Sequence, residues 1–274
     1  MTNPLQKFFR QPKIFISLPS KGIYNAPGEI QGDVENMPVY GMTGMDEIIV
    51  KTPDALLSGE STVKIFESCC PSIKNGWEVN SLDTDVLLVA IRIATYGNEM
   101  SIGHKCPNCQ ELNDYDVELG KILDHYNSCK YDSKVVMKEL VIKLQPLSYK
   151  KTTEFSLKNF QLQQKLYQTD DIEDEVRKKE VIAELFHELG SIQNEIFAAS
   201  IESIDIGTQI VTEKSYIEEW LTNCDRSIFE AIKNQFNKNK ESWRIPSVTA
   251  KCMSCDHEFK IAIDLDQSSF FGNA

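Results

Sequence analysis

Two C-x-x-C motifs are the residues of this chain best suited to chemistry. The first pairs Cys106 with Cys109, and the second pairs Cys252 with Cys255. The turn of such a motif places both sulfurs on one side of the backbone, and four thiolates are a complete ligand set for a tetrahedral structural zinc ion. The sequence therefore predicts one zinc bound by these four cysteines, with no open position for water and hence no catalytic role.

The two motifs are far apart in the chain but similar in context. They lie roughly 140 residues apart, against 15–20 in an ordinary zinc ribbon. Lys105 and Lys251 precede the motifs, and alternating runs at 113–119 and 259–265 follow them, which is typical of half-buried strands. We expect a zinc-ribbon-like element built from these two distant knuckles, which carries everything between them as an insertion.

Other interpretations of the cysteines remain open. A redox dithiol usually shows one C-x-x-C near a βαβ pattern, and four unrelated buried thiols are also conceivable. His104 and His257 lie beside the motifs and could replace a ligand, although a solvated or neighbouring position fits them better. The remaining cysteines show no metal spacing and are predicted to be small buried hydrophobic residues: Cys69, Cys70, Cys129 and Cys224.

The composition excludes several functional classes. A net charge of −12, from 29 basic and 41 acidic residues, argues against general binding to nucleic acid or anionic membranes. The sequence has no signal-peptide core and no apolar run of transmembrane length, so the free thiols indicate a reducing cytosol. It contains no phosphate-binding glycine loop, G-x-S-x-G or H-E-x-x-H motif, so we expect neither an enzyme nor a small-molecule substrate.

The first half of the chain is predicted to be an arm followed by an α+β domain. Residues 1–45 are rich in Gly, Pro and Asn and are predicted to form an extended N-terminal arm with a short strand at 14–18 and a second strand and loop at 37–45. Residues 46–145 are predicted to form an α+β domain with the first knuckle. It includes a short helix at 53–57, a buried helix at 82–96 capped by Ser81 or Asp83, and a strand at 135–144. Arg92 in the buried helix must find an acid or reach solvent.

The second half is predicted to be mostly helical. Residues 146–242 show 3.6-residue periodicity, with an antiparallel hairpin over 149–203 and helices at 216–222 and 227–237. Ser215 and Glu218 fit a capping box for the first of these two helices, and the chain is expected to fray at 237–240. Residues 243–274 carry the second knuckle and a tail whose Phe270-Phe271 pair could anchor in a partner or pack back. The predicted fold class is α+β.

The order of several segments resembles a known family. The segments are FISLPSKGIY at 15–24, MTGMDE at 42–47, TPDALLSG at 52–59 and DVLLVAIRIATYGN at 85–98, with the first C-x-x-C motif directly after them. This order is similar to a family of baseplate proteins from T-even-like contractile-tailed bacteriophages that are involved in the central hub. The resemblance covers most of residues 14–110 and, weakly, the second motif with Phe270-Phe271.

The resemblance implies a non-enzymatic viral protein. Its partners would be other baseplate or tail hub proteins. It would act in the host cytoplasm during assembly and, where retained, in the tail baseplate of the virion. The alternative is a zinc-ribbon nucleic-acid-binding protein of phage transcription or packaging, which the charge of −12 disfavours and which predicts salt-dependent retention on DNA or RNA. A third class, a dithiol enzyme, would need exposed thiols of low pKa.

Overall fold

The computed structural model describes residues 3–52, 58–137 and 139–263, which fall into two compact units. Unit 1 comprises residues 1–129 and 243–274, and unit 2 comprises residues 130–242. Both units contain helices and strands, so the predicted α+β class is confirmed. The predicted division into four segments stays a prediction. The short helix predicted at 53–57 and the tail pair Phe270-Phe271 lie outside the described residues.

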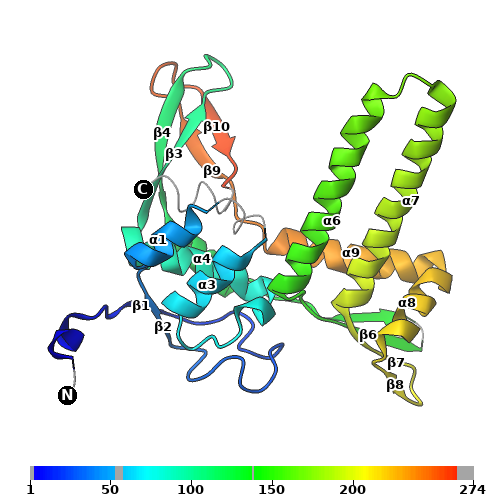
Figure 1. The fold of residues 1–274 in the computed structure, drawn as a ribbon, viewed down its shortest axis with the longest axis horizontal. Coiled ribbons are helices and arrows are strands. Elements are labelled where there is room, and N and C mark those ends of the chain that lie inside the picture. Colours follow the sequence, from blue (N-terminus) through cyan, green and yellow to red (C-terminus); the bar gives the residue numbers. More distant parts are fainter. Residues whose placement is uncertain (1–2, 53–57, 138, 264–274) are drawn as a thin grey trace. The chain divides into compact units, whose positions relative to one another are not determined.

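Unit 1 contains short helices and three separate two-stranded antiparallel sheets, β1–β2, β3–β4 and β9–β10 (Figure 1). Its elements are η1 (Pro4–Phe8), β1 (Pro12–Ile16), β2 (Met37–Tyr40), α1 (Gly44–Val50), α3 (Glu60–Cys69), η2 (Gly76–Glu78), α4 (Ser81–Tyr96), β3 (Glu99–Lys105), β4 (Leu112–Glu118), α5 (Leu119–Ser128), β9 (Val248–Lys251) and β10 (Glu258–Ile261).

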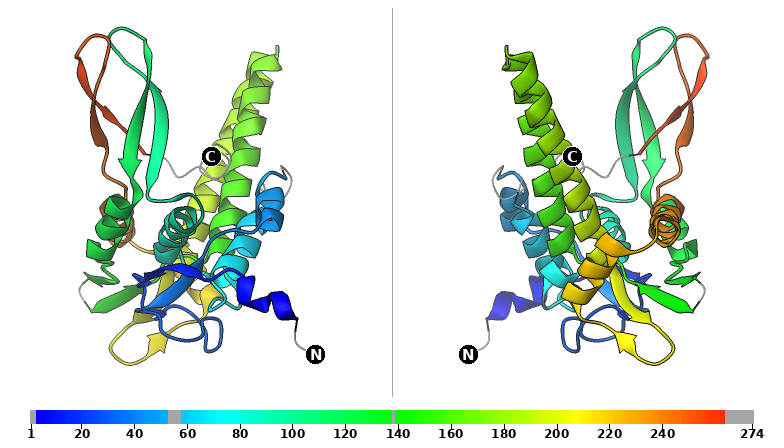
Figure 2. Two further views of the ribbon diagram at one scale, coloured as in Figure 1. Left: turned by 90° about the vertical axis from the view of Figure 1, so that its left-hand side faces the viewer. Right: turned by 90° about the vertical axis from the view of Figure 1, so that its right-hand side faces the viewer.

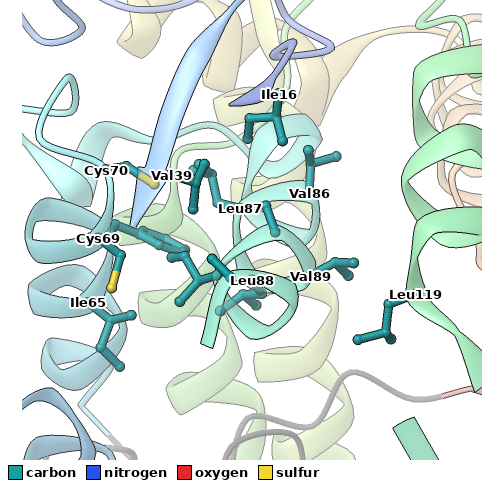
Figure 3. Packing of buried hydrophobic residues seen from close by; sticks show 14 of the residues in the cluster. Ile16, Val39, Ile65, Cys69, Cys70, Val86, Leu87, Leu88, Val89 and Leu119 are labelled. Carbon is teal, nitrogen blue, oxygen red and sulfur yellow. The ribbon is translucent and has the colours of Figure 1, made fainter. Parts of the chain in front are cut away.

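Helix α4 lies at the centre of the hydrophobic core of unit 1. The helix is buried on more than one side, because it has fully buried residues at Leu87, Val89 and Ile91. The nearly continuous apolar sequence of α4 predicted this burial. Strands β1 and β2 and helix α3 pack against it (Figure 3). The core also includes residues of the predicted N-terminal arm, because Leu18 and Met37 are buried within it.

The first turn of α4 differs from the prediction, because the N-cap is Asn80 and not Ser81 or Asp83. The Asn80 side-chain oxygen accepts a hydrogen bond from the Leu82 N–H at 3.1 Å. The buried Asp83 carboxylate instead accepts hydrogen bonds from the Ser20 N–H at 2.9 Å, the Ser20 hydroxyl and the Asn80 amide at 2.7 Å. It thereby links the helix start to the loop after β1.

Near the other end of α4, the Arg92 guanidinium lies 5.3 Å from the centre of the Tyr96 ring.

Asp83 gives the stability of the protein a predictable pH dependence. Burial raises its pKa, against the opposing effect of the hydrogen bonds from Ser20 and Asn80. Its contribution to stability is therefore fully present below the unfolded-state pKa of about 3.9 and is lost as the pH rises through the higher folded-state pKa. Relative to Asp83→Asn, the wild-type free energy of unfolding should fall as the pH rises above about 4. Urea unfolding of both proteins across this range measures the difference, and a rise would contradict it.

Arg10 attaches the first residues of the chain to the rest of unit 1. Its guanidinium donates hydrogen bonds to the carbonyl oxygens of Gly41 at 2.8 Å and Ser68 at 2.6 Å. It also lies 3.5 Å from the carboxylate of Asp46, which forms a capping box with Thr43 at the start of α1. The 3₁₀ helix η1 before this anchor buries none of its residues.

The described residues of unit 2 form a four-stranded antiparallel sheet, in the order β5-β6-β7-β8, with four α-helices and one 3₁₀ helix (Figures 1 and 2). Its elements are β5 (Lys134–Met137), β6 (Leu140–Leu144), α6 (Tyr149–Gln168), η3 (Thr169–Asp171), α7 (Glu175–Ser200), β7 (Ile201–Asp205), β8 (Ile210–Val211), α8 (Lys214–Asn223) and α9 (Arg226–Ser242). The prediction of one strand over 135–144 is wrong, because the chain reverses after Met137 and pairs Val135 with Ile142.

The helical hairpin predicted over 149–203 is confirmed as α6 and α7, except that the helix ends at Ser200 and Ile201 starts a strand. The predicted fraying at 237–240 is wrong. Asn239 is buried, and its amide exchanges hydrogen bonds of 2.9 and 3.2 Å with the backbone of Asp132, which keeps α9 helical to Ser242. The predicted capping box of Ser215 is also wrong, because α8 begins at Lys214, two residues earlier than predicted, and its N-cap is Glu213.

Candidate metal centre

Each C-x-x-C motif lies at the tip of a β-hairpin in unit 1. The first motif connects β3 to β4, and the second connects β9 to β10. The two hairpins lie side by side with their tips together (Figures 1 and 2). Strands therefore fix both ends of each motif, and the pairing of β3 with β4 and of β9 with β10 determines where the sulfurs point.

The two tips have the same backbone geometry. In the first, the Cys106 N–H donates to the carbonyl of Glu111 and the Gln110 N–H donates to the carbonyl of Cys106, both at 2.9 Å. In the second, the corresponding bonds join Cys252 to His257 at 2.9 Å and Asp256 to Cys252 at 3.0 Å. The residue after each second cysteine is left-handed, with φ of 61° at Gln110 and 57° at Asp256. The same turn thus presents two sulfurs from each hairpin.

The four sulfurs converge on one point. The Sγ atoms of Cys106 and Cys255 are 3.7 Å apart, those of Cys109 and Cys252 are 3.6 Å apart, and all four lie within 4.8 Å of one another. A tetrahedral ion with Zn–S bonds of about 2.3 Å places its sulfurs about 3.8 Å apart. A disulfide bond would need about 2.05 Å. The spacing therefore fits four ligands around one ion and does not fit disulfides.

The neighbours of the sulfurs include groups that the sequence analysis did not identify. The side-chain amides of Asn108 and Asn113, both on the first hairpin, donate to the sulfurs of Cys255 and Cys252 on the second, at 3.6 and 3.5 Å. Such donors stabilise thiolates and hold the two tips in register. Because the partners are more than a hundred residues apart, no local sequence signal could have revealed them.

The flanking histidines take part in packing. The rings of His104 and His257 both stack on Phe259 of β10, with centroids 5.7 and 6.2 Å away, and Tyr115 of β4 meets the same ring edge-on at 5.9 Å. Among the described residues, the converging group consists of the four cysteine sulfurs and includes neither histidine. Phe259 thus joins the two hairpins just below their tips.

The thiols of Cys109 and Cys252 affect the pKa of each other. Burial acts to raise the pKa of Cys252, but hydrogen bonds from the N–H groups of Ser254 and Cys255 and from the Cys109 thiol lower it to about 6. The N–H of Glu111 favours a Cys109 thiolate, but hydrogen bonding to the neighbouring sulfurs raises the pKa of Cys109 to about 12. Close thiols share protons in this way because several negative charges repel one another, and a bound cation removes that repulsion.

The other cysteines lie outside this group. Cys69 and Cys70 are fully buried in the core of unit 1, as predicted (Figure 3). Burial raises the pKa of Cys69 to about 12 and raises that of Cys70 further, so neither is a reactive thiolate at neutral pH. Cys129 and Cys224 are only half-buried, so the prediction of full burial is wrong for them.

Comparison with known families identifies the chain. Residues 45–272 match the family model described as T4 bacteriophage base plate protein. The chain belongs to this family. The match spans both C-x-x-C motifs and confirms the resemblance to T-even-like baseplate proteins. No curated protein and no solved structure gives a significant match.

Family membership indicates a structural protein of the phage baseplate, whose partners are other baseplate proteins. Within the described part of the chain, no helix combines the length and the apolar character needed to cross a membrane.

Proposed function

We propose that this chain is a non-enzymatic component or assembly factor of the baseplate's central hub, which acts through protein–protein contacts and holds one structural zinc ion. The observation that carries the proposal is the convergence of the four cysteine sulfurs, from segments 143 residues apart, in a chain of the T4 base plate family.

The donor set favours zinc. Four thiolates at tetrahedral spacing suit zinc or iron–sulfur chemistry, and a single ion with four protein ligands is the arrangement of structural zinc sites. Bound there, the ion would supply a rigid cross-link and no reactive position. Cys106 and Cys109 would hold it from one hairpin and Cys252 and Cys255 from the other, while Asn108 and Asn113 would donate to the thiolates of the second hairpin.

The cross-link explains how a small element can be rigid. The two hairpins are two-stranded sheets, and an isolated two-stranded sheet is marginally stable in water. When a metal joins the two tips, its free energy of binding adds to the free energy of folding. The hairpins then need no large hydrophobic core of their own. The C-terminal hairpin is thereby fixed to the first half of the chain.

The beginning of the chain offers apolar contact groups. Leu5, Phe8 and Phe9 are exposed around η1, just before the Arg10 anchor. Such a segment can gain further order when it binds a neighbouring protein. This is consistent with a role in clamping adjacent subunits.

Quantitative mass spectrometry of purified virions, together with baseplate intermediates from infected cells, tests the proposal. A fixed ratio to known tail proteins in virions would make the chain a hub subunit, and the ratio would indicate its symmetry. Presence in intermediates but absence from virions would make it an assembly factor. Absence from both would contradict the proposal.

A further inference from the structure

One face of the β3–β4 hairpin leads from the core of unit 1 to the four sulfurs. Residues paired across antiparallel strands lie on the same face of the sheet. This face carries, in order toward the tip, the pairs Met100 with Val117, Ile102 with Tyr115, and His104 with Asn113. The first pair is buried in the core, and in the third pair the Asn113 amide donates to the sulfur of Cys252 at 3.5 Å. Tyr115 therefore lies between the core and the metal centre.

The ring of Tyr115 is packed against the second hairpin. It meets the ring of Phe259 on β10 edge-on, with the two centroids 5.9 Å apart. The rings of His104 and His257 stack on the same Phe259, at 5.7 and 6.2 Å. An edge-to-face contact of this kind fixes the orientation of both rings. The direction of the Tyr115 side chain is thus set by packing between the hairpins.

The hydroxyl of Tyr115 has an unused hydrogen-bonding capacity. Its oxygen is shielded from solvent, and no group in the described part of the chain forms a hydrogen bond with it. A buried donor without an acceptor is costly, and buried polar groups in proteins nearly always have a partner. An orphaned donor beside a set of metal ligands indicates an acceptor that forms only when the metal is bound.

The sulfurs are the groups that act on this hydroxyl. Burial raises the pKa of Tyr115, and the negative charges of the four sulfurs raise it further, with Cys252 having the largest effect among them. The hydroxyl therefore stays protonated at neutral pH and can donate. Asn113, which already reaches Cys252, is two residues away on the same strand, or about 6.8 Å along it. A tyrosine side chain is long enough to span that distance.

Metal binding makes the sulfurs better acceptors. A thiol is a weak acceptor, whereas four thiolates around one zinc ion leave an excess of two negative charges in the group. Hydrogen bonds to charged acceptors are roughly twice as strong as bonds between neutral groups. A buried donor beside the sulfurs offsets part of this charge and so favours the loaded site over the empty one.

We propose that Tyr115 is a positioning residue of the metal centre, whose hydroxyl donates a hydrogen bond to the sulfur of Cys252 when the ion is bound and strengthens the binding of the ion. The proposal rests on the proposed function, since it needs the metal. It adds a third donor to Asn108 and Asn113, which also belong to the first hairpin and donate to sulfurs of the second. The first hairpin thereby supplies the groups that hold the thiolates of its neighbour.

Tyr115→Phe tests the hydroxyl, because it keeps the ring against Phe259 and removes only the donor. Tyr216→Phe is the matched control, since Tyr216 is an exposed residue of unit 2. The zinc affinity of the purified full-length chain is measured by competition with a chromogenic chelator. It should fall about tenfold for Tyr115→Phe, at the lower end of the effect usual for groups that hydrogen-bond to metal ligands. Tyr216→Phe should bind zinc like the wild type.

Cobalt(II) in place of zinc distinguishes a hydrogen bond to sulfur from a role in packing alone. A tetrahedral cobalt–thiolate site absorbs light by transferring charge from sulfur to the metal. A hydrogen bond withdraws electron density from the sulfur and so raises the energy of this transition. In cobalt-loaded Tyr115→Phe the band should therefore move to longer wavelength, whereas Tyr216→Phe should give the wild-type spectrum. A hydroxyl bonded to His104 or to water instead would leave the band in place.

The proposal requires both results. Wild-type zinc affinity in Tyr115→Phe, or a cobalt band at the wild-type position, would overturn it while leaving the proposed function intact. Failure of the wild-type chain to bind either zinc or cobalt would instead contradict the structural metal site of the proposed function.

Discussion

Purified wild-type protein should contain one zinc ion per chain, and Cys252→Ser should reduce the zinc content to a small fraction of that value. Loss of one ligand opens the tetrahedral site and leaves the partner sulfurs without a shared ion. Structural zinc contributes on the order of 10–16 kcal/mol of apparent binding free energy. We therefore expect Cys252→Ser to destabilise the folded protein more than any other single substitution predicted here and to separate the two hairpin tips. Elemental analysis and thermal unfolding measure both effects.

Cys224→Ser is the matched control for this substitution. Cys224 is a half-buried thiol in unit 2, outside the converging group, so its replacement should leave the zinc content unchanged. Equal zinc content in Cys252→Ser and Cys224→Ser would show that the four sulfurs do not form the site. Cys106→Ser should behave like Cys252→Ser, because the ion needs a sulfur pair from each hairpin.

Phe197→Ala should lower the free energy of unfolding of unit 2 by about 3–5 kcal/mol, as is usual for removal of a buried aromatic ring. Phe197 is fully buried at the end of α7, and its ring meets those of Phe229 and Phe236 edge-on, at 5.3 and 5.5 Å. The substitution removes both ring contacts and leaves a cavity beneath α9. Urea unfolding followed by circular dichroism measures the loss.

Phe186→Ala on the same helix is the matched control, because an exposed ring outside the core should change stability by no more than about 0.5 kcal/mol. Both variants should keep wild-type zinc content, since the four cysteines belong to unit 1. If Phe197→Ala and Phe186→Ala were equally stable, the aromatic cluster would not form part of the core of unit 2.

Local patterns in the sequence were sufficient to predict the helices and strands that form because of their own hydrophobic pattern. The continuous apolar run at 82–96 identified α4 as a buried helix, and periodicity identified the hairpin of α6 and α7. The alternating run after each motif identified β4 and β10. In each case the period of the hydrophobic residues directly reflects which side of the backbone is buried.

The errors arise where a distant residue decides the local structure. Asn80 caps α4 while Asp83 turns to Ser20, which lies 63 residues earlier in the chain. Asn239 keeps α9 helical by bonding to Asp132, 107 residues away. A buried hydrogen bond of this kind outweighs the weak helix propensity of an Asn-rich segment. No window of neighbouring residues contains that information.

The sequence by itself determined the candidate ligands, because two C-x-x-C pairs supply the four thiolates that a tetrahedral metal site needs. Only the tertiary structure decided that Cys106, Cys109, Cys252 and Cys255 meet, since that depends on two hairpins packing side by side around Phe259. It also decided which apolar residues of α6 and α7 form a core and which stay exposed. Both results depend on contacts between segments that are distant in the chain, whereas a sequence pattern reports the face of a single segment.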